Sequence, residues 1–327
     1  MITAIDWGKV ERKKPLAPFS TLHAGGSAES FIIARTPDEL AALAIASQKE
    51  GWDMTILGSG SNILPSDDGV FGLVVVYQAQ SITVDPNGMV HADCGSLFQN
   101  LFLKTAQAGL QGLQFAVGIP GSVGGALVSN AGAYRSEVSS FLVEIEVVYN
   151  GERKWVPPSF LEFSYRDSLL RRPNPPKCAM LRLRMKLERG RAKDVFDEAR
   201  DYQRQRISKQ PPSASAGSFF KNVNDLNFAQ SLDFLPDRFK ASGVVPAGYL
   251  IEQAGLCGLR HGGAMVSRLH ANFLVNVAGA TATDIRSLAE LVKRKVKATF
   301  GVTLEEEVLY LGDWSAFEPR LNRPLGS

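Results

Sequence analysis

Two glycine-rich segments are the first candidates for chemistry in this chain of 327 residues. The first, Gly58-Ser59-Gly60-Ser61-Asn62, offers backbone amides without bulky side chains in the way, as a loop that holds a phosphate requires. In a dinucleotide fingerprint the third glycine would stand where this chain has Ile63, and no acidic residue ends a following strand at the expected distance. A Rossmann domain is therefore not predicted, and the loop alone indicates either a phosphate site or a plain turn.

The second segment runs from Gly118 to Tyr134 and reads GIPGSVGGALVSNAGAY. It carries five glycines before Ala133, and small residues fill most of the gaps between them, which few core packings require. We interpret it as backbone wrapped closely around a flat, phosphate-bearing cofactor; the alternative is a flexible surface loop. Two such segments in one chain favour a dinucleotide over a mononucleotide.

Consecutive glutamates in the apolar segment VTLEEEVLYL are the next candidates. If this segment is a strand, Glu307 shares one face with Leu309, while Glu306 shares the other with Val308. At least one acid must then point at an apolar side, where a carboxylate needs a partner such as Arg166. The alternative is an edge strand whose acids are solvated.

The first glycine loop is predicted to follow a helix and a short strand. Thr36-Pro37-Asp38-Glu39 is typical of a helix start, with a capping threonine and proline in the first turn, and Gly51 indicates the end after about Glu50. The apolar stretch from Met54 to Leu57 then predicts a strand that leads directly into the loop.

Strands are expected to dominate the middle of the chain. SITVD and MVHAD alternate around the turn DPNG, and EIEVVY and RKWVP flank Asn150-Gly151, which suits a tight hairpin. Residues 96–108 predict a helix, whereas residues 118–132 are too rich in glycine for either regular element. Near the end, Thr283 or Thr281 opens an amphipathic helix that Gly301 ends.

Composition excludes several classes of protein. Hydrophobic residues at 45% and charged residues at 21% are typical of a globular protein, and a net charge of +3 without basic runs does not predict nucleic-acid binding. The three cysteines are far apart and the four histidines lack ligand spacing, so neither disulfides nor a metal site is expected. The N-terminus has no apolar signal core and no segment approaches 18 apolar residues, so we expect a cytoplasmic protein without a membrane span.

A set of motifs in a fixed order gives the chain a family resemblance. FSTLHAGGSAE, LGSGSNIL, GIPGSVGGALVSNAGAY, FSYRDS, AGSFFKN, AGYLIEQAGLCG, SRLHANFLVN and LEEEV occur in the order expected of the UDP-N-acetylenolpyruvoylglucosamine reductases, known as MurB. The chain resembles that family from about Phe19 to Gly312. The short spacing between Arg166 and Ser218 resembles its more compact, second type, although Val223 stands where many relatives have proline.

The resemblance implies an α+β fold. A two-part FAD-binding region of the vanillyl-alcohol-oxidase (PCMH-like) type would be followed by an α/β substrate-binding domain. We expect FAD-binding subdomains at 1–78 and 79–205, a substrate-binding domain at 206–313 and a loose tail at 314–327. The cofactor would be non-covalent FAD, held by Gly58, Ser59, Gly60, Ser61, Asn62, Ile63, Ile119, Pro120, Gly121, Ser122, Gly124, Gly125 and Asn130.

The same resemblance implies a reaction and its residues. NADPH would reduce the bound FAD, which would then reduce a UDP-sugar nucleotide that carries an enolpyruvyl ether. Arg166 resembles the arginine that pairs with the enolpyruvyl carboxylate, Ser218 the proton donor, and Glu307 the catalytic glutamate. The other expected substrate-binding residues are Tyr165, Arg206, Lys209 and Asn222.

Two other functions are kept as alternatives. A flavin oxidase with the same FAD domain would deliver electrons to oxygen, and a non-catalytic sugar-nucleotide-binding protein would need only the binding residues. The joint presence of Arg166, Ser218 and Glu307 argues against the second. We expect a monomer.

Overall fold

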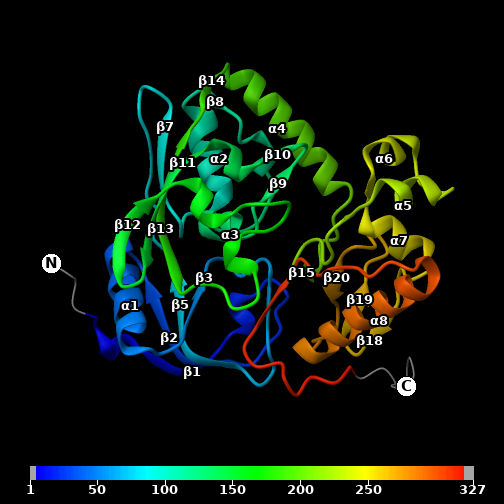
Figure 1. Cartoon of the computed structure of the whole chain (residues 1–327), viewed down its shortest axis with the longest axis horizontal. Coiled ribbons are helices and arrows are strands. Elements are labelled where there is room, and N and C mark those ends of the chain that lie inside the picture. Colours follow the sequence, from blue (N-terminus) through cyan, green and yellow to red (C-terminus); the bar gives the residue numbers. More distant parts are fainter. Residues whose placement is uncertain (1–4, 320–327) are drawn as a thin grey trace. The chain divides into compact units, whose positions relative to one another are not determined.

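The computed structural model describes residues 5–319, which divide into two compact units (Figure 1). Within the described residues, the first unit consists of residues 5–14, Ala28–Gly60 and Phe71–Ser208, and the second of Pro15–Ser27, Ser61–Val70 and residues 209–319. Each unit therefore collects segments that are far apart in the sequence. The three-part division expected from the sequence stays a prediction.

Two larger sheets and two strand pairs organise the first unit. The four-stranded sheet has the order β1 (Glu11–Pro15), β2 (Ser27–Ala34), β5 (Val70–Tyr77), β3 (Met54–Leu57), and the five-stranded sheet has the order β12 (Glu152–Val156), β11 (Leu142–Tyr149), β13 (Cys178–Lys186), β7 (Met89–Asp93), β6 (Ile82–Val84). β9 (Gly132–Ala133) pairs with β10 (Ser136–Glu137), and β8 (Leu110–Gln111) pairs with β14 (Glu188–Arg189). The predicted hairpins, β6 with β7 and β11 with β12, are confirmed as antiparallel pairs.

Strand β13 shows why the five-stranded sheet has one apolar face. Leu181, Leu183 and Met185 are fully buried, whereas Arg182 and Arg184 alternate with them and pair with glutamates of β11. Because successive strand residues point to opposite faces, one face enters the core and the other is covered by ion pairs.

Four helices complete the first unit: α1 (Pro37–Glu50), α2 (Phe98–Gln107), α3 (Val123–Val128) and α4 (Ala192–Ile207). The predicted ends of α1 are confirmed, since the hydroxyl of Thr36 accepts from the Glu39 amide at 3.1 Å and Gly51 adopts a left-handed conformation. Helix α3 corrects the prediction that residues 118–132 form no regular element. Short 3₁₀ turns of this unit span Trp7–Lys9, Gln114–Ala116, Val138–Phe141, Pro158–Leu161 and Leu169–Arg171, and the turn Ala17–Phe19 belongs to the second unit.

The second unit packs the long helix α8 (Ala282–Phe300) against a four-stranded sheet (Figure 1). The sheet has the order β15 (Ala214–Ser215), β20 (Leu274–Asn276), β19 (Ala264–Val266), β18 (Arg260–His261). Thr281, one of the two predicted caps, begins α8, and the predicted apolar face with Leu288 and Val292 is fully buried. The other elements are α5 (Leu226–Ser231), α6 (Asp237–Ser242), α7 (Ala247–Gln253) and the pairs β16 (Val223–Asn224) with β17 (Val244–Val245) and β4 (Ile63–Pro65) with β21 (Leu309–Leu311).

The segment predicted as one long strand, residues 302–311, is a strand only at β21. Its middle forms a single bridge, between Phe220 and Glu306, and the prediction of a regular strand is wrong there. The strict alternation of faces expected for the glutamates therefore does not apply.

The end of the described chain packs on α8. Arg286 of α8 lies 4.6 Å from the ring centre of Trp314 and 4.2 Å from that of Phe317. Both aromatic residues belong to the stretch expected to be a loose tail, of which residues 320–327 lie outside the described residues.

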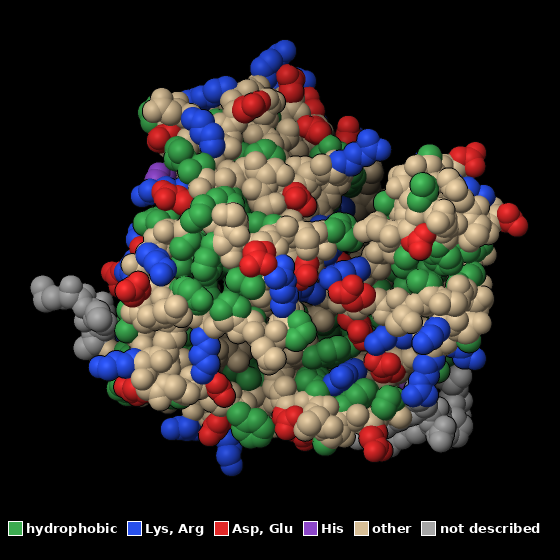
Figure 2. Space-filling model, in the orientation of Figure 1, with side chains coloured by type: hydrophobic (Ala, Val, Ile, Leu, Met, Phe, Trp, Pro, Cys, Tyr) green, Lys and Arg blue, Asp and Glu red, His purple; other side chains and the backbone are tan. Residues whose placement is uncertain are grey.

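The charged side chains on the visible face are mixed in sign (Figure 2). Basic and acidic groups alternate there, in keeping with the net charge of +3. Within residues 5–319, no helix is both long and apolar enough to cross a lipid bilayer.

Candidate active site

The first glycine loop follows β3, as the sequence predicted, and leads into β4. Its first residue, Gly58, lies directly against the second glycine segment: a Cβ on Gly58 would stand 2.0 Å from the hydroxyl oxygen of Ser122. A side chain at this position would therefore collide with Ser122. The two segments meet because Gly58 has no side chain.

The second glycine segment turns sharply into helix α3. Gly121 has a φ of 133°, and the hydroxyl of Ser122 then accepts from the Gly125 amide at 3.1 Å as the helix cap. Gly124 approaches the backbone of Cys94, where its amide donates to the Cys94 carbonyl at 2.7 Å. This backbone, with so few side chains, suits a phosphate-bearing cofactor such as FAD.

The remaining residues expected to contact the cofactor fall on these two segments, with different surroundings. Pro120 is exposed, and Ile119 is partly exposed. Asn130, by contrast, is fully buried, and its side-chain amide donates to the Ser164 carbonyl at 3.1 Å. Its observed contact therefore joins the glycine segment to the turn that carries Arg166.

Arg166 lies on that tight turn. Ser164 and Asp167 bond to each other through their backbones at 3.1 and 3.2 Å, and Arg166 between them has a φ of 53°. Its guanidinium donates to the carbonyls of Gly132 and, at 3.5 Å, Asn130. The predicted catalytic arginine is thus held by the same glycine segment that is predicted to hold FAD.

A second guanidinium lies in this region of the first unit. Arg206, in the last turn of α4, contacts Gly118 and faces the ring of Tyr134 at 6.0 Å. Its Nε is buried without a hydrogen-bond partner, and no carboxylate of the described residues pairs with it. Burial lowers the pKa of Arg206, and the charge of Arg166 adds to that effect. Arg166 and Arg206 are thus neighbouring cations, and the Nε of Arg206 is a donor that the protein leaves unbonded. This combination suits an anionic ligand.

Tyr165 and Tyr134 are the exposed aromatic residues near these arginines. Tyr165 is 43% exposed, and the guanidinium of Arg166 lies 5.5 Å from its ring centre. Tyr134 stacks on Tyr202 of α4 with ring centres 3.7 Å apart. Sequence reasoning assigned no role to Tyr202, which a helix pattern alone does not distinguish from a surface residue.

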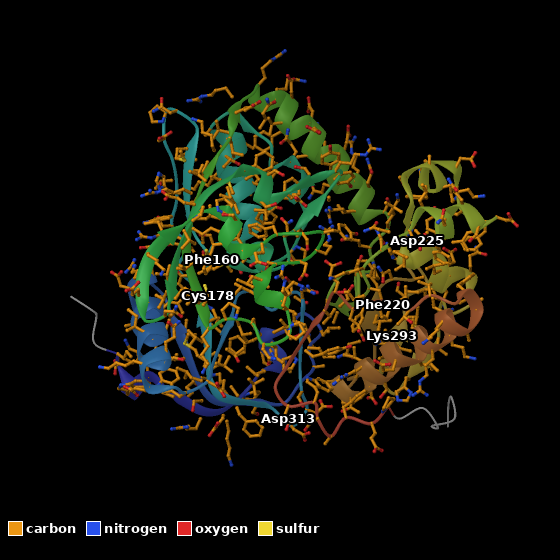
Figure 3. All side chains as sticks on the ribbon, in the orientation of Figure 1. Phe160, Cys178, Phe220, Asp225, Lys293 and Asp313 are labelled. Carbon is orange, nitrogen blue, oxygen red and sulfur yellow. The ribbon has the colours of Figure 1, made fainter. Side chains whose placement is uncertain are left out.

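In the second unit, the residues after Ser218 are bonded on two sides (Figure 3 labels Phe220). On one side, Asn272 bonds to Phe219 and Phe220. On the other, the Glu307 amide donates to the Phe219 carbonyl at 2.8 Å. Ser218 and Glu307, predicted from separate motifs, therefore lie on adjoining backbone segments.

The two candidate glutamates have different surroundings. The carboxylate of Glu306 receives the ammonium of Lys293 at 3.1 Å and the hydroxyl of Tyr310 at 3.2 Å, and its side chain is 18% exposed. Burial by itself lowers the pKa of Lys293, but the hydrogen bonds and charges of Glu290 and Glu306 outweigh burial and raise this pKa. Glu306 is therefore a largely buried acid whose charge is paired with Lys293.

Two of the residues expected to bind the substrate, Lys209 and Asn222, belong to the second unit. Lys209 is exposed, and Asn222 uses its side-chain oxygen to accept from the Ala247 amide, the first of α7, at 3.2 Å. Burial lowers the pKa of His270, and the charge of Lys209 adds to that effect. Sequence reasoning gave His270 no role, although it lies within a family motif.

Two family models match the chain. The FAD binding domain matches residues 28–155, and the UDP-N-acetylenolpyruvoylglucosamine reductase C-terminal domain matches residues 208–311. Relatives described as UDP-N-acetylenolpyruvoylglucosamine reductase include proteins of Bacillus velezensis, 36% identical with 93% of this chain and 95% of the relative covered, and Bacillus subtilis, 33% identical with 93% and 95% covered.

The chain belongs to the UDP-N-acetylenolpyruvoylglucosamine reductase family. The solved structure of the MurB of Thermus caldophilus agrees, with a TM-score of 0.73 and 33% identity over 92% of this chain and 98% of that one. The predicted family, the α+β fold and an FAD-binding oxidoreductase are thereby confirmed. The roles of individual residues stay predictions.

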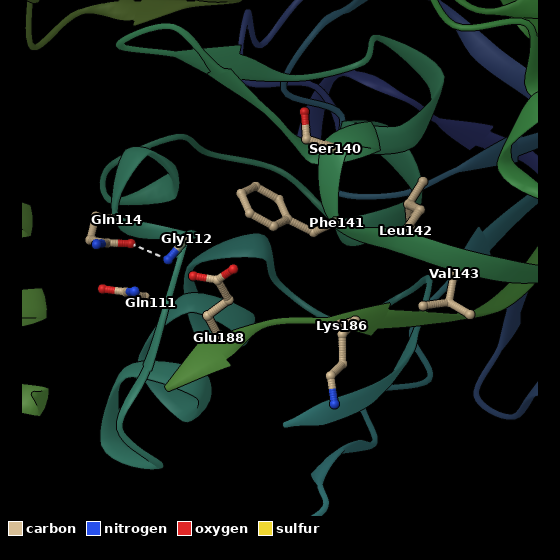
Figure 4. Close-up of a pocket in the computed structure, with 9 residues that line it drawn as sticks. All are labelled: Gln111, Gly112, Gln114, Ser140, Phe141, Leu142, Val143, Lys186 and Glu188. Atoms are coloured by element: carbon tan, nitrogen blue, oxygen red, sulfur yellow. Dashed lines mark hydrogen bonds between the residues drawn. The ribbon is translucent and has the colours of Figure 1, made fainter. Parts of the chain in front are cut away.

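One open hollow on the first unit contains none of the predicted site residues of this MurB-family chain (Figure 4). Gln111, Phe141, Lys186 and Glu188 contribute to its wall. The ammonium of Lys186 donates to the Asn87 carbonyl, so the cation is already used by the protein itself. We assign this hollow no part in the site.

Proposed function

We propose that this protein reduces UDP-N-acetylglucosamine enolpyruvate to UDP-N-acetylmuramate with NADPH and non-covalently bound FAD, which supplies a precursor of peptidoglycan. The observation that carries the proposal is the hydrogen bond from the Glu307 amide to the Phe219 carbonyl, 2.8 Å long. This bond joins the backbone segments that carry a predicted proton donor and a predicted catalytic glutamate, in a chain that also matches an FAD binding domain. A sugar-nucleotide sensor would not require this pair.

The reaction has three requirements. A hydride must reach the methylene carbon of the enolpyruvyl ether, negative charge that develops toward the carboxylate must be stabilised, and the other carbon must receive a proton. FAD, when bound, supplies the hydride. The protein must supply the cation and the acid.

Arg166 is the proposed cation. Its forked guanidinium suits a carboxylate, and the carbonyls of Asn130 and Gly132 fix the orientation of that fork. Such preorganisation stabilises developing charge without reorganisation during the reaction. Arg206, which lacks an acidic partner among the described residues, would add positive charge for the anionic nucleotide.

Ser218 is the proposed proton donor, and Glu307 acts with it. Ser218 is partly exposed and its hydroxyl makes no hydrogen bond within residues 5–319, so the hydroxyl can turn toward a ligand. A hydroxyl is a weak acid, so this step requires the stabilised enolate that Arg166 and Glu307 provide. Lys209, Asn222 and Tyr165 are the other proposed substrate contacts.

We propose that NADPH and the sugar nucleotide use the site in turn. The nicotinamide nucleotide would reduce the cofactor and leave before the enolpyruvyl substrate enters, which is a ping-pong scheme. We propose that the protein acts as a monomer.

The decisive test is an anaerobic flavin absorbance trace. The purified protein receives one equivalent of NADPH and is then mixed with UDP-N-acetylglucosamine enolpyruvate. We expect bleaching on the first addition and rapid return of absorbance on the second, with an equal amount of UDP-N-acetylmuramate. Return only when air is admitted would favour the oxidase, and binding of the nucleotide without return would favour the sensor.

A further inference from the structure

We propose that Asn62 and Asn272 are positioning residues that fix Ser218 and Glu307 relative to each other, an inference that rests on the proposed function. Neither side-chain amide is expected to touch the reacting atoms. Both amides bond to the backbone segments that carry Ser218 and Glu307. All of the residues that make these contacts belong to the second unit.

Asn272 holds the segment that follows Ser218. Its side-chain oxygen accepts from the Phe220 amide at 3.0 Å, its side-chain nitrogen donates to the Phe220 carbonyl at 2.8 Å, and its own carbonyl accepts from the Phe219 amide at 2.7 Å. Asn272 is only 3% exposed. Only a side chain with both a donor and an acceptor can make the paired contact to Phe220, and a carboxylate cannot.

Glu307 is bonded to the opposite side of this segment. The Glu307 amide donates to the Phe219 carbonyl at 2.8 Å, and the Lys221 amide donates to the Glu305 carbonyl at 2.9 Å. Backbone bonds of this kind fix the separation of two segments. The segment of Ser218 therefore lies between Asn272 and the segment of Glu307.

Asn62 completes the arrangement from the glycine loop. Its side-chain nitrogen donates to the Glu307 carbonyl at 3.0 Å, and its own carbonyl accepts from the Leu309 amide at 3.0 Å. Both backbone polar groups of Glu307 are thus bonded, one to Phe219 and one to Asn62. The same side chain, which is predicted to contact FAD, thus bonds to the backbone of the predicted catalytic glutamate.

The arrangement matters because the Ser218 hydroxyl has no hydrogen-bond partner within residues 5–319 to orient it. Its position therefore depends on its backbone, and a misplacement of about 1 Å can cost a reaction on the order of a hundredfold in rate. Loss of the hydrogen bonds of either side chain, Asn62 or Asn272, should slow the step that uses Ser218 and Glu307. It should leave reduction of the flavin by NADPH nearly unchanged, since that step needs neither side chain.

The experiment compares Asn272→Asp and Asn62→Ala with a matched control, Asn276→Asp. Asn276 is a similar amide clamp in the same unit, donating to the Leu22 carbonyl at 2.9 Å and accepting from the Ala280 amide at 2.8 Å. It bonds to neither candidate segment. Each FAD-loaded variant is tested in both halves of the absorbance trace, and its backbone amides are followed by hydrogen exchange.

For both test variants we expect a fall of about tenfold to a hundredfold in substrate-dependent return of absorbance, with the NADPH step within about threefold of wild type. Exchange should rise at residues 218–222 and 305–309. Asn276→Asp should show neither change. If Asn272→Asp does not fold, Asn62→Ala carries the test alone.

Three results would overturn the inference. Loss of FAD by Asn62→Ala, with a normal rate in the molecules that keep it, would make Asn62 a cofactor ligand. Equal slowing of both halves, or the same behaviour in the Asn276 control, would make the clamps merely structural. If the wild-type protein itself fails to recover its absorbance with the substrate, the proposed function and this inference fail together.

Discussion

The turn of Arg166 and the segments of Ser218 and Glu307 position their side chains in different ways. In the first unit, the guanidinium of Arg166 is itself bonded to two backbone carbonyls. In the second unit, the observed bonds hold the backbone of Phe219, Phe220 and Glu307, while the Ser218 hydroxyl has no partner within the described residues.

This difference matches the proposed tasks. A cation that stabilises charge acts best when its orientation does not change, because no reorganisation then accompanies the reaction. A proton donor must be able to turn its hydroxyl toward the reacting carbon. We therefore expect that substitution of a reacting side chain and substitution of the residues that hold it in place will change the reaction rate by different amounts.

The largest expected effect follows removal of the hydroxyl. Ser218→Ala should reduce substrate-dependent return of flavin absorbance by on the order of a hundredfold or more, with flavin reduction by NADPH nearly unchanged. Stopped-flow absorbance measures both rates. Ser242→Ala, which removes an exposed hydroxyl that donates to the Phe239 carbonyl, is the matched control. Equal loss in both steps would refute the role of Ser218.

The adjacent glutamates should separate activity from stability. Glu307→Gln should slow substrate reduction by about tenfold to a hundredfold with little change in Tm. Glu306→Gln removes the charge that pairs with Lys293, and should lower the free energy of unfolding by about 1–3 kcal/mol with activity near wild type. Steady-state kinetics measures the activity of each variant, and thermal unfolding measures its stability. Loss of activity in Glu306→Gln with loss of stability in Glu307→Gln would assign the catalytic role to Glu306.

A smaller effect should follow a change in the form of the cation. Arg166→Lys keeps the charge but cannot bond to two carbonyls and a ligand carboxylate with one planar fork. We expect kcat/KM for the sugar nucleotide to fall by roughly tenfold, with most of the loss in kcat. A wild-type value would show that anchoring of the guanidinium contributes nothing.

The smallest effect concerns the support of Asn272. The Nδ1 of His270 accepts from the Asn272 amide at 3.2 Å, which requires that this nitrogen carry no proton. Burial lowers the pKa of His270 and the charge of Lys209 adds to this, while Glu252 opposes it. The imidazole of His270 therefore binds a proton more tightly in the unfolded chain than in the folded protein. The stabilisation from neutral His270 is present above its unfolded pKa of about 6.5 and is lost as the pH falls toward its lower pKa in the folded protein.

His270→Asn keeps an acceptor oxygen but cannot be protonated. Thermal unfolding between about pH 7 and pH 5 should therefore show a larger loss of Tm in wild type than in this variant. Parallel pH profiles would mean that His270 does not support Asn272 through its neutral form.

Local sequence patterns predicted the elements whose ends are set by nearby residues. Helix α1 follows from the Thr36 cap and Gly51, and the β11–β12 hairpin follows from Asn150-Gly151. Helix α3 was missed because glycine lowers helix propensity, and the cap at Ser122 and the contact of Gly124 with Cys94 decide its structure.

The site was predictable only as a list of residues. Family motifs named Arg166, Ser218 and Glu307, but the alternation argument at the glutamates rested on a regular strand that the structure does not contain. The partners Lys293 and Asn272 come from distant segments, and no local pattern indicates such contacts. For the same reason the bond from Asn62 to Glu307 could not be anticipated.

The second unit is built from segments that are far apart in the sequence, and this affects how the protein folds during its synthesis on the ribosome. Leu22 and Leu64 are fully buried in the same core as Ile285, Leu288 and Val292 of α8, yet they are synthesised more than two hundred residues earlier. Until α8 emerges, these early leucines lack their final neighbours, and contacts so distant in sequence slow folding and leave apolar surface exposed. A nascent chain stopped before α8 should therefore engage chaperones through residues 15–27 and 61–70.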